Sequence, residues 1–476
     1  MFLWKDKWSY YPTLKMNQIN STYEHKLQSA LYNISKRGLC FDTSKLDMLR
    51  KKVADEISSL EDRLSNSLGA RITVGKKKDT EINIRAPKQL LEFLKKKGFK
   101  VPRIPPTKAE KILGKTEYKE SVGELALRKL FSETGIEAVA DILRVRELET
   151  MRSRYIEAVY IDNIFYSNYD VCGTLTGRRG SKKIIFGWGG NGQNLPKHSE
   201  LGKAYRSCIK PRSGGIFFQV DQVSAEDWPT AALSGNNAAL DELRNRVDRH
   251  RKLASYIFGK PEDLINEYPE RFLGKKGRHG NNYRLGAETF SNALIQEGTF
   301  LSTATCQLIL EKVNNYDPSI RAVYHPYITQ QINRDRFLRT PLGRERYFIG
   351  FRPNSSNANL YCEAFAYIPQ STVGDNTGLA ILELERDSFI VSESHDSILQ
   401  EITPKLQDLE IAFDKATRAF DREITFHNGF KINIPIEAEI GFDLGHLKKV
   451  KSRDNLKEVL QQLEEEDNAK AAIPLG

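Results

Sequence analysis

The sequence predicts an α/β or α+β protein, in which many helices surround a sheet that carries carboxylates. The run GIFFQVD, residues 215–221, is strand-like and ends at Asp221. A strand pair is expected in SFIVSESHDSILQEI, residues 388–402, with Asp396 at its tip. Long stretches elsewhere carry apolar residues three and four positions apart, as amphipathic helices do. Strands mixed with many helices indicate an α/β or α+β catalytic body.

The first half of the chain is expected to be mainly helical. Residues 23–66 have the periodicity of two helices separated at Gly38, and Asp42 or Thr43 can cap the second. Residues 71–85 include the run KKKDTE, which indicates an exposed basic hairpin or loop before a helix in APKQLLEFLKKKGF. A long helical stretch is expected over residues 121–160.

The C-terminal segment NLKEVLQQLEEEDNAKAAIPLG is expected to be a surface helix followed by a frayed end. Leu456, Val459, Leu460 and Leu463 have helical spacing there. Such an acidic helix either is simply solvated or docks a partner protein, and the pattern leaves both interpretations open.

Composition narrows the class of protein. The 476 residues are 39% hydrophobic, enough for two or three domains. A formal charge of +10 favours a polyanionic partner. Five scattered cysteines suit reduced thiols in an intracellular protein better than a zinc site or disulfide framework. No window approaches 18 apolar residues, so no membrane partner is expected; an organellar leader stays open.

Two carboxylates borne on strands, Asp221 and Asp396, could meet at one edge of the sheet. Phosphoryl transfer to a 3′-hydroxyl uses two divalent cations, one activating the nucleophile and one neutralising the leaving pyrophosphate. Oxygen ligands suit Mg²⁺, with Mn²⁺ as a substitute, and substrate phosphates complete the shell. An isolated Asp is usually a cap or a solvated group, so the flanking sequences must identify the chemistry.

The flanks of Asp221 resemble a known family. VDQVSAEDWPTAALSGN, residues 220–236, resembles the first motif of family A DNA polymerases, the bacterial DNA polymerase I and phage replicative group. The resemblance implies that Asp221 binds metal and that Glu226 excludes the ribose 2′-hydroxyl. Deoxynucleotides are therefore the expected substrates.

RFLGKKGRHGNNYRLG, residues 271–286, is similar to the second motif through Arg271, Lys275, His279 and Tyr283. Four-residue spacing puts Arg271, Lys275 and His279 on one helical stripe. By resemblance this stripe positions an incoming triphosphate, and Lys275 is also the proton donor to pyrophosphate. The alternative is a basic surface helix, which Gly274, Gly277 and Gly280 would weaken by about 1 kcal/mol each.

VSESHDSILQEI resembles the third motif, which implies that His395 faces the primer end and Asp396 binds metal. Ser397 stands where the family has Glu, and we expect the aspartate pair to hold both ions without it.

Shorter matches complete the set. By resemblance, Arg178 in TLTGRRGS and Asn194 in GQNLP contact the primer–template, and Gln370 reads its minor groove. His250 in VDRHRKLASYIFG would contact the triphosphate; the alternative for this lone His is surface or core packing. The chain departs from the family at Trp228, Arg284 and His279, the last of which predicts altered use of dideoxynucleotides.

The resemblance implies a right-hand polymerase fold with a helical thumb, an antiparallel palm sheet and helical fingers. The expected segments are a head at residues 1–20, a thumb at 21–160, palm at 161–235, fingers at 236–345, palm at 346–450 and a tail at 451–476.

The implied function is template-directed DNA synthesis, which extends a primer 3′ end on a primer–template with dNTPs. No stretch before residue 20 can hold a proofreading exonuclease, so a separate exonuclease, helicase or clamp is a candidate partner. Compactness suggests a viral source, which would place the protein in the host cytoplasm. The alternatives are a single-subunit RNA polymerase, which Glu226 opposes, and a catalytically inactive polymerase-like protein that binds DNA as an accessory factor.

Overall fold

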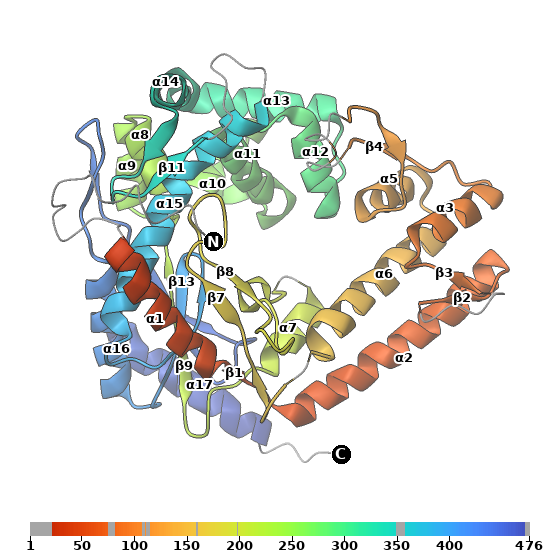
Figure 1. The fold of residues 1–476 in the computed structure, drawn as a ribbon, viewed down its shortest axis with the longest axis horizontal. Coiled ribbons are helices and arrows are strands. Elements are labelled where there is room, and N and C mark those ends of the chain that lie inside the picture. Colours follow the sequence, from red (N-terminus) through yellow and green to blue (C-terminus); the bar gives the residue numbers. More distant parts are fainter. Residues whose placement is uncertain are drawn as a thin grey trace.

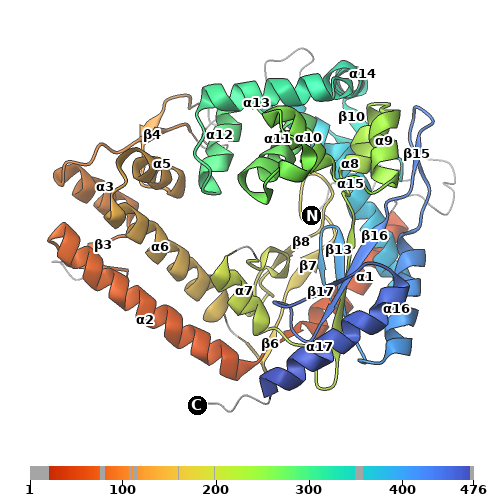
Figure 2. The same cartoon turned by 180° about the vertical axis from the view of Figure 1, so that it is seen from behind.

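The computed structural model describes residues 21–74, 81–106, 110, 115–158, 160–197, 199–348 and 358–471. Figures 1 and 2 show a central body around a sheet, a long helical arm on one side and a helical block at one end of the body. The mixture of helices and strands confirms the predicted fold class.

The largest sheet among the described residues has five antiparallel strands in the order β12–β13–β9–β16–β17. Both predicted strand regions lie in it. Its strands are β9 (Ile216–Gln222), β12 (Ile390–Ser394), β13 (Ser397–Ile402), β16 (Ile436–Gly441) and β17 (Lys448–Val450). Asp221 on the central strand stands directly opposite Ser397 on one side and Glu437 on the other.

Helices cover this sheet and form one hydrophobic core with it. They are α1 (Ser21–Arg37), α8 (Asp227–Leu233), α9 (Asn237–Arg244), α15 (Ala358–Leu384), α16 (Leu406–Phe420) and α17 (Leu456–Ala471). The first of these helices, α1, packs on the body through α15 and β12. The predicted tail helix exists, but Leu456, Val459, Leu460 and Leu463 are buried against the body.

The helical arm comprises α2 (Thr43–Leu68), α3 (Pro87–Lys96), α5 (Glu124–Thr134) and α6 (Glu137–Met151) around a second core. Gly38, at φ 58°, separates α1 from α2, and the Asp42 side chain accepts a hydrogen bond from the Lys45 N–H at 3.2 Å, as predicted. Of the hairpin or loop expected at residues 71–85, the hairpin is wrong, because β2 (Ile72–Thr73) and β3 (Ile82–Asn83) pair in parallel; the loop alternative stays a prediction. Residues 75–80 lie outside the described residues.

The helical block has a separate small core. It contains α10 (Arg249–Phe258), α11 (Phe272–Asn282), α12 (Ala287–Gln296) and α13 (Thr303–Tyr316), and α14 (His325–Asp335) lies beside it. The arm reaches this block, because α5 packs against α12 and the Tyr118 hydroxyl donates to the Glu288 carboxylate.

The remaining regular elements are short. They are α7 (Glu200–Ser207), η2 (Gly192–Asn194) and the strand pairs β1 (Leu39–Cys40) with β6 (Ile164–Phe165), β4 (Arg103–Ile104) with β5 (Lys119–Glu120), β7 (Asn168–Asp170) with β8 (Gly180–Lys182), β10 (Phe337–Arg339) with β11 (Glu345–Tyr347), and β14 (Ile424–Thr425) with β15 (Lys431–Ile432). Within the described ranges, no helix has the length and apolar character needed to span a membrane.

Candidate active site

Asp221 and Asp396 lie side by side at one end of the central sheet. Asp221 is the penultimate residue of β9, and Asp396 lies in the tight turn between β12 and β13. The Gln222 N–H donates to the Asp396 carbonyl at 3.2 Å, which joins the turn to β9. Because β13 begins at Ser397 opposite Asp221, the register of the sheet brings together two carboxylates that are far apart in sequence.

The environment of this pair disfavours negative charge. Burial raises the pKa of Asp221 to about 8, and the neighbouring carboxylates of Asp396 and Glu437 add to the rise. Burial also raises the pKa of Asp396, although Arg178 and His395 act in the opposite direction. Two buried carboxylates that repel each other are stabilised by a bound cation.

The donor set fits a hard divalent cation. Aspartate oxygens are ligands that Mg²⁺ prefers, and Mg²⁺ commonly takes only one or two protein carboxylates. Ser397 adds no carboxylate, and its hydroxyl donates to the Ser394 carbonyl at 3.3 Å. Across the part of the chain that the structure describes, no group of three or more His, Cys, Asp or Glu side chains is arranged to hold a metal ion. Any ion at this site would therefore depend mainly on Asp221 and Asp396.

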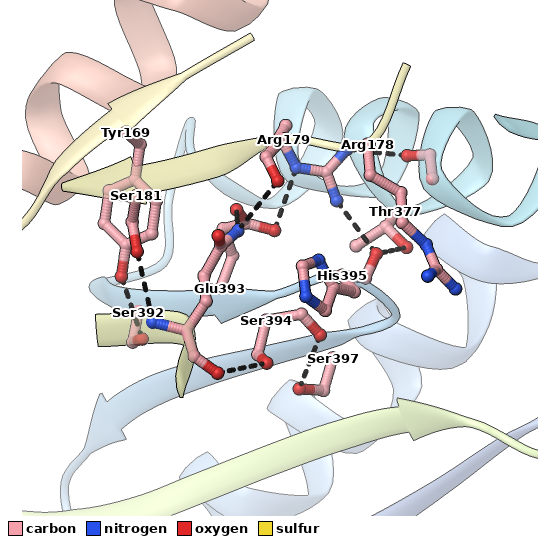
Figure 3. Close-up of polar contacts among 12 residues, drawn as sticks. Tyr169, Arg178, Arg179, Ser181, Thr377, Ser392, Glu393, Ser394, His395 and Ser397 are labelled. Carbon is pink, nitrogen blue, oxygen red and sulfur yellow. Dashed lines mark hydrogen bonds and ion pairs between the residues drawn. The ribbon is translucent and has the colours of Figure 1, made fainter. Parts of the chain in front are cut away.

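A buried arginine supports the turn that carries Asp396 (Figure 3). Arg179 Nε donates to Glu393 at 2.8 Å, Nη1 to the Gly374 carbonyl at 2.6 Å and Nη2 to the His395 carbonyl at 3.1 Å. Thr377 also donates to the His395 carbonyl at 3.1 Å, which helps to hold His395 at φ 56°. The turn is thus fixed by Arg179, directly before β8, and by Thr377 on α15.

Further contacts surround Glu393. The Gln193 amide donates to its carboxylate, and the Tyr169 hydroxyl lies 3.0 Å from Ser392 Oγ on the same strand (Figure 3). The sequence motifs predicted roles for Arg178 and His395 but none for Arg179 and Glu393. Each of these two residues lies within a matched motif, Arg179 in TLTGRRGS and Glu393 in VSESHDSILQEI. Nothing in the sequence indicated that the two side chains form an ion pair.

The predicted cationic stripe lies on α11. Arg271 precedes the helix and pairs with Asp248 at 2.7 Å, while Lys275 is exposed. The rings of His250 and His279 are 6.1 Å apart, so α10 adds a histidine beside the stripe. A Cβ on Gly274 would lie 2.5 Å from the His250 carbonyl oxygen, which shows that this glycine lets the two helices approach.

His250 is held neutral. Burial lowers its pKa to about 4, although nearby Asp227 acts in the opposite direction. Its buried Nδ1 has no hydrogen-bond partner among the described residues. The ring is therefore an uncharged polar group beside the cations of α11.

Glu226 connects the sheet end to α11. Its carboxylate accepts hydrogen bonds from the Tyr283 hydroxyl and from Arg178. Burial raises the pKa of Tyr283 well above its ordinary value, so this phenol remains a donor. Through Glu226, Arg178 and Tyr283 come together, and both Arg178 and Glu226 lie near enough to Asp396 to influence its pKa.

The remaining predicted residues lie around this group. Asn194 is exposed on η2, and its carbonyl accepts from the Tyr155 hydroxyl at 2.8 Å. Gln370 is half-buried on α15. Trp228 is buried and donates to the Val223 carbonyl at 3.1 Å, whereas Arg284 is exposed at φ 57° directly after Tyr283.

The sequence is similar to those of known proteins. The model of DNA polymerase family A matches residues 43–446. DNA polymerase I, thermostable, of Thermus thermophilus is 24% identical over 432 residues, covering 88% of this chain and 47% of the relative. DNA polymerase I of Borreliella burgdorferi is 23% identical over 444 residues, covering 90% of this chain and 44% of the relative. The chain thus spans about half the length of these relatives.

The fold is also similar to a solved structure, the POL domain of Pol1 from M. smegmatis in complex with DNA primer-template and dNTP. The TM-score is 0.73 at 21% identity, with 89% of this chain and 70% of that chain covered. The family model spans most of the sequence and includes both aspartates, Glu226 and α11. The chain belongs to DNA polymerase family A.

Proposed function

We propose that this protein is a template-directed DNA polymerase that extends a primer 3′ end with dNTPs. The observation that carries the proposal is the convergence of Asp221 and Asp396 at the sheet end, with Glu226 tying that end to α11 through Tyr283. A carboxylate pair beside a cationic helix suits nucleotidyl transfer, which needs positioning and charge neutralisation more than covalent catalysis.

Asp221 and Asp396 would hold two divalent cations, Mg²⁺ by ligand preference with Mn²⁺ as a substitute. When bound, the ions would supply activation of the 3′-hydroxyl and neutralisation of the pyrophosphate. The protein contributes a rigid geometry, because Arg179 and Thr377 fix the carbonyl of His395 next to Asp396.

The incoming triphosphate would lie along α11. Arg271 and the exposed Lys275 supply fixed positive charge, and the neutral His250 adds a hydrogen-bonding group beside them. We assign Lys275 the protonation of the leaving pyrophosphate, because its ammonium is exposed on this helix.

Selection of the sugar would fall to Glu226. Tyr283 and Arg178 hold its carboxylate in place from two directions. A fixed carboxylate at the edge of the nucleotide site would leave little room for a ribose 2′-hydroxyl, so dNTPs would be preferred. The proposal does not include proofreading: we expect this chain to leave a mismatched primer end untrimmed.

Primer extension tests the proposal. Wild type, Asp221→Ala and Asp396→Ala would be given a primed template, Mg²⁺ and either dNTPs or NTPs, with unprimed template as control. Template-dependent extension with dNTPs that both substitutions abolish is the expected result. Binding of primed DNA without extension by the wild type would instead indicate the catalytically inactive accessory protein.

A further inference from the structure

The loop between β8 and η2 presents an unusual apolar surface. Ile185 is 91% exposed, Phe186 is 73% exposed and Trp188 is 38% exposed. The rings of Phe186 and Trp188 are 5.4 Å apart. We call residues 184–188 the aromatic tip.

The aromatic tip has a defined backbone. The Ile184 N–H donates to the Trp188 carbonyl at 3.1 Å, and the Gly187 N–H donates to the Ile184 carbonyl at 2.9 Å. The Gly190 N–H then donates to the Tyr166 carbonyl at 3.0 Å, which ties the loop to the body. These bonds hold the apolar side chains outward, where exposure to water is unfavourable unless another surface covers them.

The loop is joined to the catalytic turn. Gln193, at its C-terminal base, donates to Glu393, and the Ser394 hydroxyl donates to the Gln193 carbonyl at 3.3 Å. A molecule bound at the active site and extending along the body would therefore pass close to this loop.

The space beyond the loop is bordered by the helical arm. α7, which follows the loop, lies beside the C-terminal end of α6 in both views (Figures 1 and 2). A cavity of about 730 Å³ opens there, and its lining includes Tyr155, Pro196, Ser199, Arg144 and Phe300.

The charges beside the aromatic tip favour a polyanion over an apolar protein surface. Lys182 and Lys183 immediately precede it and are exposed, and the ammonium of Lys182 is 3.8 Å from the carboxylate of Asp170 in an exposed ion pair. The chain as a whole carries a formal charge of +10.

We propose that the aromatic tip binds the primer–template duplex just behind the primer end. Phe186 and Trp188 pack in the minor groove, while Lys182 and Lys183 contact phosphates. Apolar side chains commonly enter minor grooves. Such contacts tolerate any sequence, because the acceptors of that groove are nearly the same for all base pairs. The inference rests on the proposed function and adds a DNA contact to it.

Equilibrium binding tests the contact. The anisotropy of a fluorescein-labelled primer–template would be titrated with wild type, Phe186→Ser/Trp188→Ser, Lys182→Gln/Lys183→Gln and the control Leu308→Ser. Leu308 is 62% exposed on α13 and lies outside the proposed contact. We expect the aromatic double variant to raise Kd about tenfold or more, because two apolar rings are no longer buried in the groove, and the control to match wild type.

Salt titration separates the two kinds of contact. The lysine double variant should lower the slope of log Kd against log salt by about 2, because two phosphate contacts are lost. The aromatic double variant should keep the wild-type slope. The conservative variant Phe186→Tyr/Trp188→Phe should bind like wild type, which shows that rings and not folding determine the loss.

Tryptophan emission gives a direct readout. Trp188 is 38% exposed, whereas Trp228 is 4% exposed. Adding unlabelled primer–template should change the emission of wild type, and Trp188→Phe should lose that change. The proposed contact would be overturned if the aromatic double variant bound with the wild-type Kd and if Trp188→Phe showed the same change in emission as wild type. In that case primer extension by the wild type would still support the proposed function. A wild type that neither binds nor extends primed DNA would overturn the proposed function itself.

Discussion

Arg179 and Glu393 form a 2.8 Å ion pair that is almost completely removed from water, directly behind the turn that presents Asp396. Arg179 also donates to the His395 carbonyl, so this one side chain spans the ion pair and the catalytic turn. Its role is positioning, because its guanidinium contacts the turn and not the carboxylates of Asp221 and Asp396.

Arg179→Met should destabilise the protein by about 3–5 kcal/mol, because it leaves Glu393 buried and unpaired. Urea unfolding measures this loss. Arg179→Met/Glu393→Gln should recover much of the stability, since no buried charge remains. Primer extension by the double variant should still need about tenfold more Mg²⁺ than wild type, as the turn has lost its anchor. Wild-type Mg²⁺ dependence in the double variant would contradict the positioning role.

Asp221→Asn should stabilise the protein in the absence of divalent cations. The pKa of Asp221 is raised from 3.8 to about 8, so the folded state keeps a proton that the unfolded state releases. Wild-type stability therefore falls as pH rises from about 4 to about 8. At pH 8 in EDTA the variant should gain on the order of 2 kcal/mol in unfolding free energy. The gain should shrink toward pH 5 and on adding Mg²⁺; a constant gain would exclude this cause.

Glu226→Ala should admit ribonucleotides. The carboxylate held by Tyr283 and Arg178 is the group expected to exclude the 2′-hydroxyl. We expect the ratio of kcat/KM for NTP to that for dNTP to rise tenfold or more, which corresponds to about 1.4 kcal/mol of lost discrimination. Tyr283→Phe should show a smaller change in the same direction, because Arg178 still holds the carboxylate. An unchanged ratio in both variants would remove Glu226 from sugar selection.

His279 should control the use of dideoxynucleotides. It lies on α11 with its ring 6.1 Å from that of His250, at the position where the family has an aromatic residue. His279→Phe and His279→Tyr should change the ratio of dideoxy to deoxy incorporation by severalfold, and in different directions from each other if the hydroxyl matters. Single-nucleotide incorporation measures the ratio, and identical values in all three proteins would refute the assignment.

His325 should make the fold sensitive to acid. Burial lowers its pKa from 6.5 to about 4, and the ring stacks on Phe365 at 4.1 Å. Because only the unfolded state takes up the proton in this window, stability is lost as pH falls from 6.5 to about 4. Between pH 7 and pH 5 the wild type should lose about 2 kcal/mol that His325→Gln does not. His25→Gln, on the exposed face of α1, serves as the control.

The sequence predicted the elements whose signals are local. The apolar run before Asp221 forms the expected strand β9, and Asp42 caps α2 with the expected hydrogen bond. Contacts between segments that are far apart in the sequence were not predicted. The ion pair of Arg179 with Glu393, and the parallel pairing of β2 with β3, depend on tertiary contacts that no local pattern contains.

The packing of α1 illustrates the same limit. Its periodicity predicts a helix, but the apolar stripe of a helix does not specify which core it enters. Only the fold shows that Tyr23 and Leu27 belong to the core of the central body and not to that of the helical arm. Likewise the spacing of Leu456 and Leu463 correctly predicted a helix in the tail, but it did not indicate that this helix packs on the body.

Gly274 allows α10 and α11, the two helices proposed to bind the incoming triphosphate, to pack closely against each other. A helix with alanine there would itself be more stable by about 1 kcal/mol. The added methyl group would nevertheless strike the His250 carbonyl oxygen, because a Cβ at this position lies only 2.5 Å from it. One added methyl group would therefore push His250 away from Lys275. The distance between these two proposed phosphate-binding residues thus depends on the absence of a side chain at position 274.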